Sequence, residues 1–558
     1  MNRHFVILLS MMFFMVTGAA GQKKVSPNHY VIQFKDKANS PYSISKPEAY
    51  LSVKALKRRS KFNISITEND IPVNQSYLSE LTKLGLKIVS TSKWMNHAVV
   101  YTTDTTLIDK AVKYPFVKPY KVAEKPKREV VTTTTNNAVN KTKAEKASDT
   151  LVKYGKGSNQ IVMLNGHALH NRGFMGQGVT IAVLDAGFYY VNKLPSFDSL
   201  WANKQILGWY DFVDNDTSVW DADTHGMQVL STIGANIPGE FIGTAPKANF
   251  YLFRTEQASS EYTIEEYNWL TAAEKADSLG VDMIHSSLGY NDFDDNVSSY
   301  SYKDMDGNTA ISSIAADIAT AKGILVVTSA GNEGGDVWKY ITAPADADSV
   351  LTVGATDGRG NYTYFSSQGP TIDGRVKPNT MAQGSWTTVQ GANGRITQSN
   401  GTSFSGPVIA GMTACLLQAH PNIPVMDIIR AIEQSGNYYN SPNGKMGYGV
   451  PNYLLAHLIL SGAGAVLPSE KNPFVVYPNP FSNDLAIGIY DQNYLAETTY
   501  KAEIFDLLGN IQYTSRTQPE NNNNKIFYFS NLQTLKNGVY IVRLEVNNKV
   551  FGQKIIKF

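Results

Sequence analysis

Short, almost continuously apolar runs alternate with helical stretches over residues 151–462, and this alternation constrains the fold more than any other feature of the chain. Strands that are apolar on both faces must be covered on both faces. We therefore expect an α/β domain with a mostly parallel sheet covered by helices on both sides, and functional residues at the carboxyl ends of its strands. The expected strands are 179–184, 250–253, 281–284, 324–328 and 350–354, and the expected helices include 264–279 and 310–322.

Regions of different character flank this domain. Residues 22–123 mix short alternating strands with a helical stretch near 77–84, which predicts a small α+β domain. Residues 124–150 are rich in Lys, Thr, Asn and Ala, which is typical of an exposed linker. Residues 474–558 alternate again between strands and turn signals, which predicts an antiparallel β-sandwich.

Residues 1–21 have the three-part layout of a secretory signal peptide, with an apolar run, 5–16, that is too short to span a bilayer. We therefore expect an exported protein. The only cysteine, Cys415, rules out an internal disulfide, and its apolar helical surroundings indicate a packing residue rather than a nucleophile.

Charge is segregated along the chain although the net charge is only +2. Residues 22–149 carry 23 Lys and Arg against 11 Asp and Glu, whereas residues 150–463 carry 17 against 29, so the two blocks have net charges of +12 and −12. A basic arm for nucleic acid or membranes is one interpretation. Because apolar residues are interspersed with the basic ones, we favour a folded module whose partner is the acidic block, and we expect no nucleic-acid partner.

Acyl transfer to a hydroxyl needs a nucleophile, a base, a carboxylate that orients the base, and donors for the oxyanion. Asp185 closes an expected strand, and His225 precedes Gly226 at the start of a helical run. Ser403 lies just before an apolar helix, and Asn332 follows another strand. Taken singly, each has a structural interpretation as a turn former, a packed side chain or a helix cap.

Asp185, His225, Asn332 and Ser403, in this order and these contexts, resemble the subtilisin family of serine peptidases over about residues 160–460. The most specific motif is Gly-Thr-Ser-Phe-Ser-Gly-Pro at 401–407, in which we expect the proline to fall in the first helical turn. The resemblance implies a secreted endopeptidase with an Asp-His-Ser triad and an oxyanion hole formed by the Asn332 side chain and the Ser403 amide.

The resemblance also implies how a substrate binds. An edge strand would pair with an extended peptide, and a second segment would line the primary specificity pocket, with Glu333 near its rim. The implied edge strand is Ser287, Leu288 and Gly289, and the implied pocket lining is Ala330 and Gly331.

Two positions depart from the family pattern, since Ala186 replaces a Thr or Ser and Met227 replaces a Thr, but neither removes a reacting group. The related sedolisins are disfavoured because they place Glu and Asp where His225 and Asn332 stand. A serine esterase is expected to have its nucleophile in Gly-x-Ser-x-Gly and its catalytic residues in the order Ser, Asp, His. The order Asp, His, Ser of this chain excludes that fold family. A catalytically dead binding protein usually lacks a triad member, and none is lost here.

The flanking regions carry resemblances of their own. Residues 24–123 resemble the pro-domains of subtilisins, which implies a folding assistant and an inhibitor of the same chain. Residues 474–558 resemble the sorting domain of type IX secretion, which implies that machinery as a partner and a secreted or cell-surface location reached through the periplasm. A carbohydrate-binding module is the alternative for this region.

No cofactor is required by this chemistry, and no metal is assigned to the site. Asp304, Asp306 and Asn308 place oxygens at alternate positions, as the start of a calcium loop does. The twelfth position, Ala315, excludes an EF-hand, so we favour a solvated turn over a calcium site.

Overall fold

A computed structural model describes residues 22–119, 153–461 except 296, and 474–557 with gaps at 478, 480, 482–484, 490–499, 516–524, 530–531 and 547. The expected signal peptide and linker lie outside these residues. The described chain divides into two compact units. One holds the residues up to Pro41 and those from Pro72 to 119, and the other holds Tyr42–Ile71 together with the residues from 153 onward.

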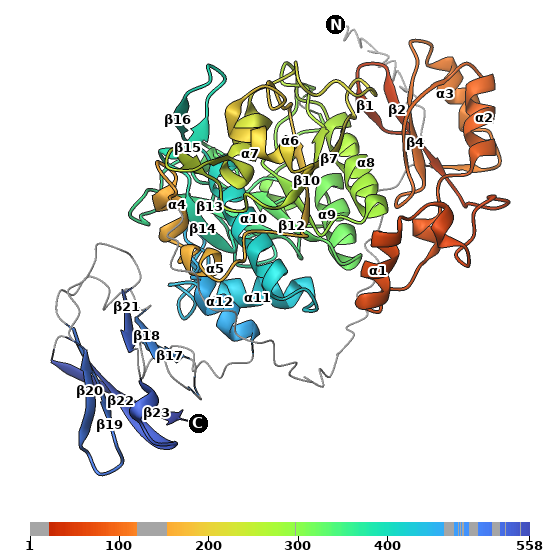
Figure 1. Cartoon of the computed structure of the whole chain (residues 1–558). Helices are drawn as coiled ribbons and strands as arrows, with labels where there is room; N and C mark the ends of the chain where they lie inside the picture. Colours follow the sequence, from red (N-terminus) through yellow and green to blue (C-terminus); the bar gives the residue numbers. More distant parts are fainter. Residues whose placement is uncertain are drawn as a thin grey trace, which may run out of the picture. The chain divides into compact units, whose positions relative to one another are not determined.

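The first unit is an antiparallel sheet with two helices, which confirms the α+β expectation (Figure 1). Its strand order is β1-β2-β4-β3, and β5 also pairs with β2, at Gln33 and Phe34, whereas β1 pairs with His29 and Tyr30. The elements are β1 Lys24–Ser26, β2 His29–Phe34, β3 Lys87–Ser92, β4 His97–Tyr101, β5 Val117–Lys118, α2 Gln75–Lys83 and α3 Thr106–Ala111.

The second unit contains a seven-stranded parallel sheet in the order β14-β13-β12-β11-β6-β10-β7. The strands are β6 Thr180–Asp185, β7 Ile206–Asp211, β10 Asn249–Arg254, β11 Met283–Ser286, β12 Leu325–Ser329, β13 Leu351–Thr356 and β14 Thr380–Gln383. All five strands expected from the sequence are present within two residues at either end, and β6 is buried along its whole length because helices cover both faces.

Two pairs of helices cover this sheet. Helices α7 and α10 pack together against one face, and α8 and α9 pack together on the opposite face (Figure 1). Helix α8 has the expected bounds, and α9 falls within its expected range. The helices of this domain are α4 Ser158–Val162, α5 His167–His170, α6 Asp198–Ala202, α7 His225–Gly234, α8 Ile264–Leu279, α9 Ile311–Ala321, α10 Thr402–Ala419, α11 Val425–Gln434 and α12 Tyr453–Leu460.

Smaller elements complete the second unit. Two hairpins join β8 Asn236–Ile237 to β9 Phe241–Ile242 and β15 Thr387–Gln390 to β16 Ile396–Ser399. Residues 42–71 form α1 Val53–Lys61 between the 3-10 turns Pro47–Ala49 and Glu68–Asp70. Among the residues that the structure describes, no helix is long and apolar enough to cross a bilayer.

The carboxy-terminal region forms two antiparallel sheets that share one apolar core, which confirms the predicted β-sandwich. One sheet has the order β17-β18-β21 and the other β20-β19-β22-β23. The strands are β17 Phe474–Tyr477, β18 Leu485–Ile489, β19 Tyr500–Phe505, β20 Ile511–Ser515, β21 Lys525–Phe529, β22 Gly538–Val546 and β23 Lys549–Lys557.

Candidate active site

The candidate catalytic residues lie at the carboxyl ends of neighbouring strands. Asp185 is the last residue of β6, Ser287 follows β11, and Asn332 lies beyond the end of β12. Strand β11 lies between β6 and β12 in the sheet, so these three side chains meet at one edge. The strand pattern of the sequence predicts that active residues gather at these ends, since parallel strands present their carboxyl ends on the same side, whereas Ser287 was implied only by the resemblance.

The carboxylate of Asp185 orients His225. His225 Nδ1 lies 2.7 Å from Asp185 Oδ1, and the backbone N–H of Ala186 donates to the same oxygen at 2.8 Å. Asp185 is fully buried, whereas the His225 side chain is 31% exposed and can meet a substrate. Gly226 is required by close approach, because a Cβ there would collide with the Gly187 carbonyl and approach Asp185 Cβ.

The second oxygen of Asp185 is less supported. Within the described residues, the buried Oδ2 has no hydrogen-bond partner. The residue that follows is Ala186, where the family pattern has a Thr or Ser hydroxyl, so the departure seen in the sequence coincides with an unpaired oxygen. Burial lowers the pKa of His225, but the charge and hydrogen bond of Asp185 and the charge of Asp223 together outweigh it, so the net pKa lies above the ordinary value of 6.5.

Ser403 is the second residue of α10, directly after a turn in which Gly401 has φ 146°. Within the described residues, the hydrogen bond of the Ser403 hydroxyl is the one that its Oγ donates to the Ser287 carbonyl, at 3.4 Å. The ring of the adjacent Phe404 lies 5.8 Å from the His225 ring. The residue next to Ser403 therefore lies close to His225, although no hydrogen bond joins Ser403 to His225 among the described residues, as is common before substrate binds.

Pro407 is the sixth residue of α10 and not part of its first turn, so our expectation for this proline was wrong. A proline at this position has no N–H for the carbonyl four residues earlier, which is that of Ser403. The hydroxyl of Ser287 donates to this carbonyl at 2.9 Å and replaces the missing donor. Ser287 and Ser403 are therefore joined by two hydrogen bonds, one accepted by Ser287 O and one donated by Ser287 Oγ.

Asn332 is held with one end fixed. Its Oδ1 accepts from the Thr402 N–H at 2.9 Å, and the Thr402 hydroxyl lies 3.0 Å away. The same hydroxyl lies 3.1 Å from the Gly331 carbonyl and can donate to either oxygen. Because Oδ1 is occupied, Nδ2 is the end available to an oxyanion. Sequence reasoning missed Thr402, which sits between Gly401 and the nucleophile.

The segment Ser287, Leu288 and Gly289 is not a strand in the free chain, because β11 ends at Ser286. Its backbone makes no hydrogen bond with other backbone groups of the described residues. Tyr290, directly beyond, pairs with Ala343 on a neighbouring loop. A backbone without strand partners suits an added peptide strand, and pairing with a substrate stays a prediction.

Ala330 and Gly331 line a small region with polar walls. A Cβ on Gly331 would lie 2.7 Å from Ser367 Oγ, 3.0 Å from Thr342 Oγ1 and 3.1 Å from Glu333 Oε2. Thr342 Oγ1 is buried and unpartnered among the described residues. Burial raises the pKa of Glu333, which accepts a hydrogen bond from Ser367 at 3.2 Å. Glu333 lies beside Gly331, and its place at the rim of a specificity pocket stays a prediction.

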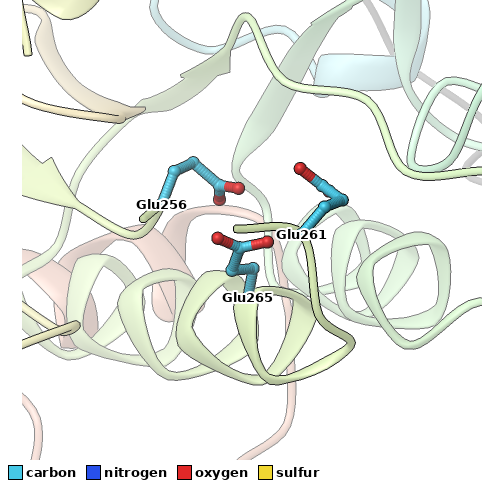
Figure 2. A group of neighbouring side chains, drawn as sticks. All are labelled: Glu256, Glu261 and Glu265. Carbon is cyan, nitrogen blue, oxygen red and sulfur yellow. The ribbon is translucent and has the colours of Figure 1, made fainter. Parts of the chain in front are cut away.

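An acidic cluster lies beside the base in a cleft of about 550 Å³ that also contains His225 and the segment 287–289. Figure 2 shows its members, Glu256, Glu261 and Glu265, directed toward one another, with ligand oxygens within 4.8 Å. Burial and, secondarily, neighbouring carboxylates raise the pKa of all three, to about 8 for Glu256, about 7 for Glu261 and about 10 for Glu265. Sequence reasoning missed this cluster, because the three residues are spread over a loop and the first turn of α8.

The Asp304–Asn308 segment, by contrast, is a turn whose side chains bond locally. Asp306 Oδ1 accepts from the Asn308 and Thr309 N–H groups at 2.7 and 2.9 Å, and Asp304 Oδ2 accepts from Ser301. Among the described residues, the carboxylates that lie close enough together to hold a cation are those of the glutamate cluster.

Comparison with known proteins gives relatives for the central domain. Subtilisin E of Bacillus subtilis (strain 168) is 29% identical over 282 residues, which are 50% of this chain and 65% of that protein. Subtilisin of Bacillus pumilus is 29% identical over 285 residues, which are 50% of this chain and 92% of that protein. The solved structure of MycP1 without its N-terminal propeptide gives a TM-score of 0.42 at 24% identity, over 54% of this chain and 96% of that one.

Family models match three successive regions. Residues 29–143 match the Peptidase S8 propeptide domain of Bacteroidota, residues 176–449 match the subtilase family, and residues 475–557 match the secretion system C-terminal sorting domain. The sorting domain indicates export to the cell surface or the medium. The chain therefore consists of a subtilase-family domain between an S8 propeptide domain and a secretion sorting domain.

Proposed function

We propose that this chain is an exported serine endopeptidase that cleaves peptide or protein substrates and is made as a precursor inhibited by its own propeptide. The observation that carries the proposal is the 2.7 Å contact between His225 Nδ1 and the buried Asp185, beside Ser403 and Asn332. His225 takes the proton of Ser403 as the hydroxyl attacks the scissile carbonyl, and returns it to the leaving amine. Asp185 holds the imidazole and stabilises its charged form.

The oxyanion of the tetrahedral intermediate is met by two donors. Asn332 Nδ2 is presented because Thr402 holds Oδ1, and the Ser403 N–H lies at the start of α10, where the helix dipole favours negative charge. The backbone of 287–289, which makes no hydrogen bond with other described backbone groups, would hold the substrate extended, and Ala330 and Gly331 would receive the side chain before the scissile bond.

Replacement of the nucleophile tests this function. Ser403→Ala should abolish both peptide hydrolysis and labelling by a fluorophosphonate, with the fold intact. Ser405→Ala is the matched control, since Ser405 lies on the same helix with its hydroxyl bonded internally to the Thr402 carbonyl. Retained labelling of the Ser403→Ala protein would refute the assignment.

Two finer proposals accompany this function. The sorting domain supports the type IX secretion machinery as the partner that exports the chain from the periplasm. No organic cofactor enters the chemistry, whereas a cation such as calcium is proposed at Glu256, Glu261 and Glu265, because oxygen ligands are those that calcium takes. Calcium should then raise the thermal midpoint of the wild type but not of Glu261→Gln; equal shifts would contradict the site.

A further inference from the structure

Residues Tyr42–Ile71 leave the propeptide sheet and belong to the unit that contains the subtilase-family domain. The chain departs at Pro41, forms α1, and rejoins the sheet at Pro72. Helix α1 packs against α8, as Figure 1 shows. A surface excursion with six Lys and Arg among thirty residues would ordinarily be a solvated charge run, so the contacts of these side chains decide its role.

Arg58 caps the ends of two helices at once. It is 6% exposed, and it donates to the carbonyls of Asp277 in the last turn of α8, Val281 just beyond α8, and Lys322 just beyond α9. It also pairs with the Asp277 carboxylate. Carbonyls at a helix C-terminus lack partners within the helix and carry the negative end of its dipole. A planar guanidinium with five donors fits this arrangement as no other side chain does.

The neighbouring charges form a network whose signs alternate across the contact. Arg59, 2% exposed, pairs with Asp277 at 3.0 Å and with Asp70 of its own segment at 2.9 Å. Asp70 in turn pairs with Lys322 at 2.8 Å. Asp70 and Asp277 are fully buried, so removing one cation leaves a charge that is poorly compensated and out of water.

This contact lies at the amino-terminal ends of the parallel strands, whereas the candidate catalytic residues lie at their carboxyl ends. Lys54 Nζ bonds to Thr180 Oγ1 and to Asp282, each at 2.7 Å, and Thr180 begins the strand that Asp185 ends. Five residue steps of about 3.3 Å separate the two ends of β6 by roughly 16 Å. The segment therefore cannot act by entering the substrate cleft.

We propose that Tyr42–Ile71 is an arginine clamp, a second anchor that holds the propeptide on the subtilase-family domain independently of the active site. The surface that it occupies consists of the C-terminal ends of α8 and α9, with Asp277 at its centre. Its occupant is this segment of the same chain. Cutting the chain between propeptide and enzyme therefore does not release the propeptide, because the buried arginines still bridge the two fragments.

The test uses the full precursor carrying Ser403→Ala, with a site for an unrelated protease inserted between residues 124 and 150. After cutting, the dissociation rate of the propeptide fragment is measured by gel filtration at successive times. Because no catalysis is involved, the result does not depend on the proposed peptidase activity. Arg58→Gln should speed dissociation by about 30-fold or more, as expected for a buried charge left without its partner.

Two variants separate the clamp from general charge attraction. Lys57→Gln removes the same charge from an exposed position of α1 and should change the rate by less than about twofold. Arg58→Lys keeps the charge but loses the fork, and should behave nearly as Arg58→Gln does. Equal rates for Arg58→Gln and Lys57→Gln would overturn the proposal.

Hydrogen exchange on the cut precursor with native Arg58 covers the case in which the arginine variants fail to fold. The amides of residues 53–61 should remain protected after cutting, and they should remain so when a peptide inhibitor fills the cleft. Exchange at unprotected rates in either state would also overturn the clamp.

Discussion

At the residue scale, the pKa of His225 links the buried Asp185 to the pH dependence of catalysis. The net pKa of the imidazole is raised above 6.5, and the base works only when neutral. Activity, measured as kcat/KM, should therefore fall as the pH drops through a value above 6.5. In Asp185→Asn the residual activity, about 10⁴-fold lower, should show this limb at lower pH, because the charge that raises the pKa is gone.

Asp223 provides the control for this pH profile. Its charge also raises the pKa of His225, but less than that of Asp185, and its side chain accepts from the His225 N–H. Asp223→Asn should move the acid limb down slightly and keep most of the activity. An acid limb that stays in place in Asp185→Asn would show that another group titrates.

The oxyanion site gives a second prediction at this scale. Asn332→Ala should lower kcat by about two to three orders of magnitude with little change in KM, a size known from a subtilisin itself. Thr402→Val should lower kcat by about tenfold, since it removes one of the two donors that hold Asn332 Oδ1, whereas Thr402→Ser should retain activity. A change confined to KM would make Asn332 a binding residue only.

At the element scale, Pro407 explains why α10 depends on the segment that follows β11. Ser287→Ala should lower the free energy of unfolding by about 1–2 kcal/mol, because the Ser403 carbonyl is left without a donor and the buried His285 Nε2 loses its partner at 2.9 Å. Pro407→Ala restores an N–H at the right position in the helix, so the double variant should be less destabilised than the sum of the two single ones. Additive effects, measured by urea unfolding, would show that the two sites are independent.

Elements were predictable from the sequence where burial is complete on both faces. The central strands gave continuous apolar runs, whereas β7 and β14 were missed because they are the two edges of the sheet. β7 contains Gly208 and three half-buried residues, and β14 is only four residues long. Periodicity is weak for such strands.

The candidate site was predictable where its residues lie in local sequence motifs, and it was not predictable where it depends on contacts between distant segments. The residues proposed to enter the chemistry lie in compact motifs at strand and helix ends, as Asp185 and Ser403 do. Thr402 acts through a contact with a distant segment, that of Asn332, 70 positions away. Local pattern carries no information on such contacts.

At the scale of the whole molecule, the charge blocks were visible in the sequence but the contact that they make was not. Arg58 and Arg59 belong to a run of basic residues on a short helix, and their partner Asp277 lies more than 200 positions further along the chain. The +12 and −12 blocks therefore predicted an attraction without its geometry. In the structure, part of that attraction is buried as discrete ion pairs.

This difference between long-range attraction and buried pairs leads to the last prediction. The isolated segment from Gln22 to Lys121 should inhibit the mature peptidase in trans, with an association rate that falls steeply between low and physiological ionic strength. Its dissociation rate should be nearly constant, because salt screens exposed charges separated by solvent far more than buried pairs. Stopped-flow inhibition at several salt concentrations measures both rates. An association rate indifferent to salt, or no inhibition at all, would remove electrostatic pairing from the account, whereas a dissociation rate that rises with salt would place the decisive pairs at the exposed rim rather than at Arg58 and Arg59.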